Sequence, residues 1–232
     1  MGVDNWNHFF VPIAIFSRIT YRAQKITILC RILFRRSQEK FMAESSNPLT
    51  TEIFDRMTDE IRIIKAARQD PRVFGELYKL YVEQVFRYLY SKIGNLHDAE
   101  DVTSQTFLAA FESFDKFRQD GHFASWLFGI ARNKAMDHFR RLYRSEHING
   151  FSELPAEDNT LAGMIKTEQE EALSKLIQAL PEEDRELIRL RFLAEMSFPE
   201  IARFLHRNEA AVKKSIYRLL ARLHSQLEVS NE

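Results

Sequence analysis

The chain has 232 residues, of which 45% are hydrophobic, so it can form one or two domains with buried cores. Its low content of glycine (7) and proline (6) favours helices over a fold with many turns. The formal net charge is zero, so composition alone does not indicate a nucleic-acid-binding protein.

The charges are nevertheless segregated along the chain. Residues 95–115 and 145–165 contain acidic residues and no Lys or Arg, whereas residues 126–144 and 203–222 are strongly basic. The zero net charge therefore conceals two basic surfaces and two acidic surfaces.

Few features of the sequence indicate an enzyme. The single cysteine, Cys30, excludes an internal disulfide framework and a Cys-based zinc site, and it is compatible with the reducing cytoplasm. The seven His residues lack metal-ligand spacing, and the chain has no Gly-rich phosphate loop and no Gly-x-Ser-x-Gly elbow. We therefore expect no catalytic residues, no metal, no cofactor and no small-molecule substrate.

Residues 1–56 form an N-terminal extension that differs from the rest. Its apolar stretch, residues 9–34, is interrupted by basic residues, so neither a transmembrane helix nor a secretory signal is expected. Three interpretations stay open. The extension is an amphipathic helix that binds a membrane surface or a partner, a packed extension of the fold, or upstream sequence that precedes a true start at Met42 or Met57.

Residues 57–144 have the pattern of a compact bundle of about four helices. Apolar residues recur at helical spacing from Asp59 to Gly94, and Gly94 is typical of a helix end. Asp98 is predicted to cap the next helix. A polar turn over residues 118–122 then leads into a helix that begins at Phe123.

The run from Phe123 to Arg141 combines an apolar helical stripe with basic residues on its other face. This combination suits a helix that binds phosphates by charge and stacks a base on an aromatic ring. Phe117, Phe123 and Trp126 have two interpretations, either core packing or a pocket for a base lifted from the duplex.

Residues 145–167 have the composition of an acidic linker, and residues 168–232 form a second helical unit. Ser197 and Glu200 have the spacing of a capping box, and Asn208 is predicted to cap the last helix. Two helices joined by a short turn at 206–208 indicate a helix-turn-helix. Its basic second helix either enters the major groove or forms a solvated corner.

Three motifs in this order resemble those of extracytoplasmic-function (ECF) sigma factors, the compact specificity subunits of bacterial RNA polymerase. The first runs from Asp98 to Phe107 and the second from Phe123 to Arg141. The third combines residues 180–185 with 200–202 and 212–213. The resemblance covers about Asp70 to Leu227. It implies an all-α fold of two small helical domains, the region 2 bundle and the region 4 helix-turn-helix, joined by a flexible acidic linker.

The resemblance also implies roles for individual residues. The acidic motif is similar to the helix that docks on the clamp helices of the polymerase β′ subunit, with contacts from Asp98, Glu100, Asp101, Gln105 and Phe107. Recognition of the −10 promoter element is expected from Phe117, Arg118, Gln119, Asp120, His122, Trp126, Asn133, Arg140 and Arg141. Recognition of the −35 element is expected from Glu209, Ala210, Lys213, Lys214, Tyr217 and Arg218.

Some residues depart from the family pattern. Where the family commonly has Ser followed by a basic residue, this chain has Lys214 followed by Ser215. His206 stands where the turn commonly has Gly, and Leu220 replaces a basic residue. These departures do not change the predicted fold, but they affect which −35 sequence the protein recognises.

The sequence thus predicts a cytoplasmic sigma factor that binds core RNA polymerase, through the β′ clamp helices and the β flap, together with promoter DNA. Family analogy adds an anti-sigma factor as a partner. The alternative is a helix-turn-helix regulator with an N-terminal helical sensor, and a third class is a membrane-tethered interaction protein that acts through residues 9–34.

Overall fold

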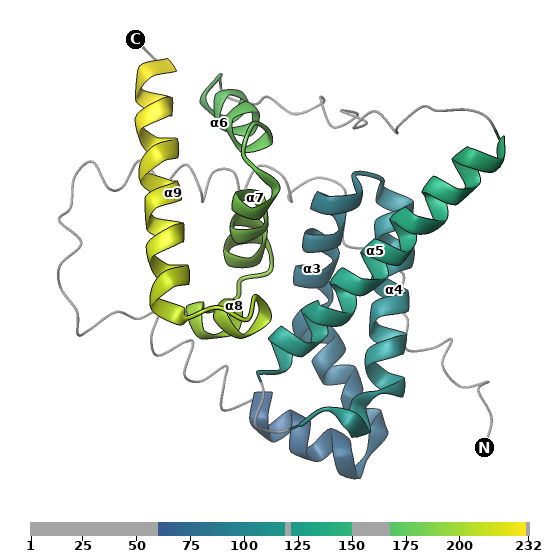
Figure 1. Cartoon of the computed structure of the whole chain (residues 1–232). Helices are drawn as coiled ribbons and strands as arrows, with labels where there is room; N and C mark the ends of the chain where they lie inside the picture. Colours follow the sequence, from purple (N-terminus) through teal and green to yellow (C-terminus); the bar gives the residue numbers. More distant parts are fainter. Residues whose placement is uncertain (1–59, 119–121, 150–167, 231–232) are drawn as a thin grey trace.

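The structure is a computed structural model that describes residues 60–118, 122–149 and 168–230. Throughout these ranges the chain forms helices joined by short turns and contains no strand (Figure 1). The all-α expectation is therefore confirmed for the described part of the chain. The N-terminal extension of residues 1–56 and residues 150–167 of the expected linker lie outside the described residues.

The first helical unit is built around three long helices. Its elements are a helix over 60–69, the 3-10 turn η3 (Pro71–Val73), α3 (Phe74–Ile93), α4 (Leu96–Glu112), the 3-10 turn η4 (Phe114–Lys116) and α5 (Phe123–Asn149). The helices α3, α4 and α5 pack against one another in every pair, and α5 crosses the other two (Figure 1).

The sequence explains where the helices around α3 begin and end. The expected continuous pattern from 59 to 94 is broken at Asp70, whose side chain accepts a hydrogen bond from the Arg72 amide while Pro71 opens η3. Proline lacks the amide hydrogen that a helix interior needs. Gly94 ends α3 in the left-handed region with φ of 82°, as expected from the sequence.

The cap of α4 differs from the prediction. Asn95, not Asp98, is the N-cap, because the Asn95 side chain accepts a hydrogen bond of 3.1 Å from the Asp98 amide. Asp98 instead lies in the first turn, where its negative charge interacts favourably with the positive end of the helix dipole. The helix therefore begins three residues earlier than Asp98 suggested.

The helix α5 is also longer than expected. The bundle was predicted to end near Tyr143, but α5 continues to Asn149, so residues 145–149 of the expected linker are helical. No proline or glycine interrupts the chain between Ile130 and Asn149, and helix propagation is favourable in such a run.

The second helical unit contains α6 (Glu168–Gln178), α7 (Glu182–Ile188), the π-helical turn η5 (Arg189–Leu193), α8 (Phe198–Phe204) and α9 (Glu209–Ser230). Pro181 is the N-cap of α7, where its missing amide hydrogen costs little. The long helix α9 packs against α6, α7 and α8. Its buried stripe consists of Val212, Ile216, Leu219, Leu220, Leu223 and Leu227.

The expected helix-turn-helix is formed by α8 and α9. Ser197 and Glu200 make the complete capping box, in which each side chain bonds the backbone amide of the other residue. The Asn208 side chain accepts a hydrogen bond of 2.8 Å from the Ala210 amide at the start of α9. Between the helices His206 adopts a φ of 53°, a conformation in which glycine is favoured.

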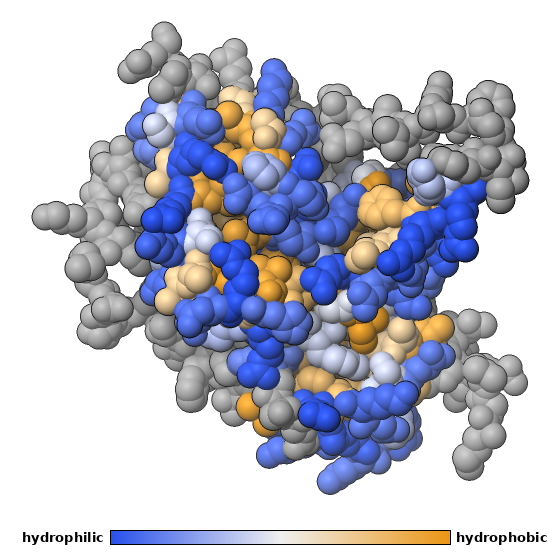
Figure 2. All heavy atoms as spheres, viewed as in Figure 1, coloured by the Kyte–Doolittle hydropathy of each residue, from blue (hydrophilic) through white to orange (hydrophobic). Residues whose placement is uncertain are grey.

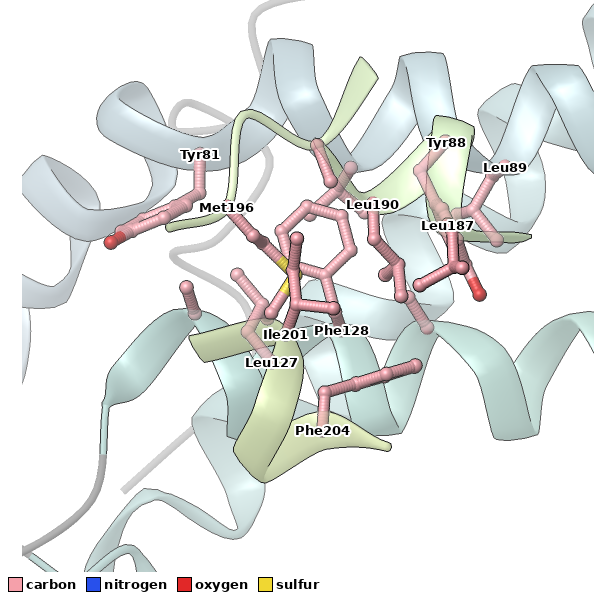
Figure 3. Packing of buried hydrophobic residues seen from close by; sticks show 14 of the residues in the cluster. Tyr81, Tyr88, Leu89, Leu127, Phe128, Leu187, Leu190, Met196, Ile201 and Phe204 are labelled. Atoms are coloured by element: carbon pink, nitrogen blue, oxygen red, sulfur yellow. The ribbon is translucent and has the colours of Figure 1, made fainter. Parts of the chain in front are cut away.

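The two helical units share one continuous hydrophobic core. Side chains from α3, α5, α7, η5 and α8 gather at the junction, where Leu127 and Phe128 lie near Leu190, Met196, Ile201 and Phe204 (Figure 3). All six of these side chains are buried. Contacts between α3 and η5 and between α5 and α8 hold the units together.

Polar contacts reinforce the junction, and Glu186 is their centre. Its carboxylate accepts a hydrogen bond of 2.6 Å from the Tyr88 hydroxyl and lies 2.7 Å from the Lys92 ammonium. Arg189 approaches the same carboxylate at 3.5 Å. Burial, followed by the charge of Glu186, raises the pKa of Tyr88 well above its usual range, so this phenol stays a hydrogen-bond donor.

A second group of contacts lies nearer to α8. The buried Arg87 pairs with Glu195 at 2.9 Å, and the Ser125 hydroxyl donates to the Glu200 carbonyl at 2.9 Å. The Arg132 guanidinium lies 4.7 Å from the centre of the Phe204 ring. Burial lowers the pKa of Arg87, and the nearby carboxylate of Glu195 opposes this effect.

Candidate nucleic-acid and partner interfaces

An aromatic cluster lies at the start of α5. The Trp126 ring centre is 5.1 Å from that of Phe117 and 5.5 Å from that of Phe123, and Phe114 lies behind them at 6.5 Å from Trp126. The three phenylalanines are buried, whereas Trp126 is only half-buried. Trp126 therefore presents part of its ring to a ligand while the phenylalanines support it.

Phe117 thus occupies a different place from the one expected for a DNA contact. It is 3% exposed, so in this structure it supports Trp126 and does not face the solvent. Arg68, from the helix over 60–69, donates a hydrogen bond to the Phe117 carbonyl. This hydrogen bond links Phe117, which directly precedes the polar turn, to the helix over 60–69.

The polar turn itself is described only at its two ends. Arg118 is exposed, and the His122 carbonyl accepts a hydrogen bond of 3.3 Å from the Trp126 amide. Gln119 and Asp120, which were expected to contact the −10 element, lie outside the described residues.

The outer surface of α5 carries the remaining −10 candidates. Asn133, Arg140 and Arg141 are all exposed, and Arg140 pairs with Asp137 at 3.1 Å on the surface. Figure 2 shows hydrophilic side chains along the outer edge of α5, next to hydrophobic ones. The helix therefore presents part of the Trp126 ring at its start, and basic residues together with the exposed Phe139 and Tyr143 further along.

The acidic candidates on α4 divide between two faces of the helix. Asp98, Asp101 and Gln105 follow one another at steps of three and four residues, so they share a face. The Asp98 carboxylate is 47% exposed and lies 3.9 Å from the His138 imidazole of α5. Glu100 lies on another side, where its carboxylate is 3.7 Å from His97.

Phe107, the last residue of this acidic motif, is in the core. It is 2% exposed, and its ring centre lies 4.8 Å from that of Tyr78. Its neighbour Leu108 is instead 52% exposed, and it lies three residues after Gln105 on the acidic face. The helical period could have identified Leu108, because it lies seven residues after Asp101 and three after Gln105 and therefore shares their face of the helix.

The outward face of α9 brings the −35 candidates together. Glu209, Ala210, Lys213, Lys214 and Arg218 are exposed, and Tyr217 is 41% exposed. Arg222, further along, pairs with Asp184 of α7 at 2.6 Å. The first half of α9 therefore presents a basic surface with one aromatic side chain, as direct readout in a major groove requires.

Neither a metal centre nor a membrane span is found in the described residues. They contain no group of three or more His, Cys, Asp or Glu side chains that could hold a metal ion. No helix in the described ranges is both long and apolar enough to cross a bilayer. The surfaces described above can bind nucleic acid and protein through charge and aromatic contact.

These features define an all-helical protein. It has one helix with aromatic and basic residues, one acidic helix and a helix-turn-helix. Two family models match it, Sigma-70 region 2 over residues 77–145 and Sigma-70, region 4 over residues 170–223. Together they cover the three helices of the first unit and the helix-turn-helix of the second. The chain belongs to the sigma-70 family, in its ECF group.

Individual relatives agree with this assignment. The ECF RNA polymerase sigma factor BldN of Streptomyces coelicolor is 35% identical over 176 residues, which are 72% of this chain and 64% of BldN. SigW of Bacillus subtilis, another ECF RNA polymerase sigma factor, is 27% identical over 178 residues, 72% of this chain and 95% of SigW. The alignment thus spans less than two thirds of BldN but nearly all of SigW.

A solved structure supports the fold. The sigma factor RpoE from Bartonella quintana, crystallised with the anti-sigma factor NepR, matches with a TM-score of 0.50 and 23% sequence identity. The match covers 67% of this chain and 97% of the RpoE chain.

Proposed function

We propose that this protein is an RNA polymerase sigma factor that directs the core enzyme to a class of promoters. It acts by binding and not by chemistry. The observation that carries the proposal is the presence, in one chain, of a half-buried Trp126 on an aromatic support and an exposed basic face on α9. A free-standing helix-turn-helix regulator needs only the second feature.

The two DNA-binding surfaces have different tasks. Lys213, Lys214 and Arg218 position the complex on the duplex −35 element, because cations on a recognition helix contact phosphates and base edges. Trp126 and the turn before α5 then hold unpaired −10 bases. Unstacking a base costs on the order of a few kcal/mol, and stacking on a ring returns about 1–3 kcal/mol per base. Binding energy can therefore open the duplex without ATP.

The acidic face of α4 is the proposed contact with polymerase. Asp98, Asp101 and Gln105 share this face, and the exposed Leu108 adds an apolar contact next to Gln105 at its end. Charged residues around an exposed apolar side chain are typical of the rim and centre of a protein interface. The partner on this face is the pair of β′ clamp helices, and the second helical unit contacts the β flap.

A regulatory partner is also part of the proposal. RpoE from Bartonella quintana was crystallised with an anti-sigma factor. We expect this chain to be held inactive by a protein of the same kind in the cytoplasm, where core polymerase and promoters are present.

Reconstituted transcription tests the function. The purified chain is added to core RNA polymerase on a library of promoter fragments, and run-off transcripts are sequenced. We expect initiation at a recurrent pair of −35 and −10 elements. If the chain neither binds core enzyme nor yields transcripts, the sigma-factor proposal fails. A parallel reaction with residues 57–232 shows whether the N-terminal extension contributes.

A further inference from the structure

Tyr217 on the outward face of α9 is supported by a neighbouring ring. Its ring centre lies 6.0 Å from that of Phe198, with a tilt of 47° between the rings. The attraction between aromatic rings at this separation adds to the free energy gained by burying their surface. Because Tyr217 is still 41% exposed, the contact restricts its side chain and leaves part of the ring accessible.

Phe198 is itself held in place by the start of α8. It is the first residue of the helix, directly after the N-cap Ser197, whose capping box with Glu200 is complete. In that box the Ser197 amide lies 2.6 Å from the Glu200 carboxylate. The backbone that carries Phe198 is therefore fixed at the point where the chain enters the helix-turn-helix.

A third side chain completes the stack. The Arg191 guanidinium, from η5, lies 4.9 Å from the centre of the Phe198 ring. It also donates a hydrogen bond of 2.9 Å to the Met196 carbonyl, which fixes its orientation. Burial lowers the pKa of Arg191, while Tyr217 and Glu200 oppose this effect. Three segments, η5, α8 and α9, thus contribute one side chain each.

We propose that Phe198 and Arg191 are positioning residues that hold Tyr217 against one thymine of the −35 element. The inference rests on the proposed function and adds to it the residues that set sequence readout. The ligand group is the C5-methyl of thymine, which in the major groove is read by apolar side chains. A ring that is already oriented loses less rotamer freedom on binding than a freely rotating one.

The position of Tyr217 on α9 fits this role. It lies four residues after Lys213 and three after Lys214, so the ring projects beside the two lysines. The lysines contribute contacts to phosphates, which are the same in every sequence, and to guanine edges, which carry no methyl group. Among the exposed residues of this face, Tyr217 has an aromatic ring that can contact the methyl group of a thymine, and it is the one held by a ring of another helix.

Deoxyuridine substitution tests the proposal, because it removes the thymine methyl alone. Holoenzyme made with the full chain is assayed on a promoter chosen by the library experiment, with each −35 thymine replaced in turn. The wild-type protein is expected to lose about 3–5-fold in initiation at one position, the amount that burial of one methyl group returns. Phe198→Leu is expected to lose this sensitivity, whereas Phe198→Tyr keeps it.

Two further variants separate positioning from packing. Arg191→Met keeps the apolar length of the side chain but removes the guanidinium, and it is expected to reduce the deoxyuridine effect to below 2-fold. Lys213→Ala is the matched control, since it weakens initiation on all templates and keeps the deoxyuridine effect. Thermal melting of each variant verifies that it folds.

The deoxyuridine effects measured for these variants either support or overturn the proposal. Loss of the effect in Phe198→Leu and Arg191→Met, with retention in Phe198→Tyr, supports the proposal. An unchanged effect in folded Phe198→Leu and Arg191→Met, or no sensitive thymine with the wild-type protein, overturns it. A wild-type holoenzyme that initiates nowhere counts against the sigma-factor function and not against this inference alone.

Discussion

At the scale of single residues, partial burial identifies the side chains that can serve a ligand. Trp126 and Tyr217 each have a ring that rests on other rings and keeps an accessible part. Phe117 and Phe107 were also predicted to be functional residues, but both are buried in the core. Sequence reasoning names all four aromatics, and only packing separates the supporting rings from the presented ones.

Trp126→Ala is expected to impair opening of the −10 element more than initial binding at −35. Loss of one stacked base, worth about 1–3 kcal/mol, lowers the open-complex equilibrium by about 5- to 150-fold. Permanganate footprinting measures opening, and gel shifts on a fragment with an intact duplex measure initial binding.

Trp126→Phe is the control for this experiment, because it keeps an aromatic ring on the support formed by Phe117 and Phe123. Equal losses of opening and of initial binding in Trp126→Ala would contradict the division of labour between α5 and α9.

His206→Gly is expected to stabilise the protein by about 0.5–1 kcal/mol. His206 has a φ of 53°, where a side chain with a β-carbon is strained and glycine is not. The greater flexibility of glycine in the unfolded chain offsets part of the gain. Urea unfolding monitored by circular dichroism gives the free energy of unfolding.

His206→Ala serves as the comparison for this variant. It removes the imidazole but keeps the β-carbon, so it should not raise the free energy of unfolding. A gain in His206→Ala equal to that in His206→Gly would show that the imidazole, and not the backbone conformation, is the source of strain.

At the scale of elements, caps determine where the helices begin. Ser197, Asn208 and Gly94 were predictable, because each stands next to a clear apolar period. The start of α4 was not, since Asn95 and Asp98 are both good caps three residues apart. Only the structure shows which of them is the cap, because the Asn95 side chain accepts the hydrogen bond from the Asp98 amide.

Asn95→Ala is expected to lower the free energy of unfolding by about 1 kcal/mol, because the Asp98 amide loses its acceptor. Asp98→Ala should cost less, about 0.3–1 kcal/mol, since Asp98 accepts no capping hydrogen bond and acts through its charge near the helix dipole and near His138. Urea denaturation of both variants gives the comparison. Asn95→Ser keeps an acceptor and should stay close to wild type, and the reverse ranking of Asn95→Ala and Asp98→Ala would contradict the assigned cap.

At the scale of the whole molecule, the two helical units are joined by one core and by charges around Glu186. This carboxylate serves Tyr88 and Lys92 of the first unit and Arg189 of its own. The arrangement leaves the outward face of α9 exposed while α8 lies against α5. Neither unit alone carries the complete core.

Glu186→Ala is expected to lower the free energy of unfolding by about 2–3 kcal/mol. The change leaves the Tyr88 hydroxyl and the Lys92 ammonium, which is 15% exposed, without this acceptor. Chemical denaturation, followed by far-ultraviolet circular dichroism, measures the loss.

The exposed Glu183 provides a matched control for Glu186 on the same helix. Glu183→Ala should stay within about 0.5 kcal/mol of wild type, as surface substitutions do. Equal effects of Glu183→Ala and Glu186→Ala would show that the junction does not depend on the Glu186 carboxylate.

The sequence by itself determined the helical class, the two helical units, the helix-turn-helix and the family. These depend on local periodicity, caps and motif spacing, which neighbouring residues specify among themselves. Only the tertiary structure decided that Phe107 and Phe117 are buried, that Glu186 links the two units and that Arg191, Phe198 and Tyr217 form one stack. Such contacts join residues far apart in the chain, and no local pattern records which distant side chain will meet a given face.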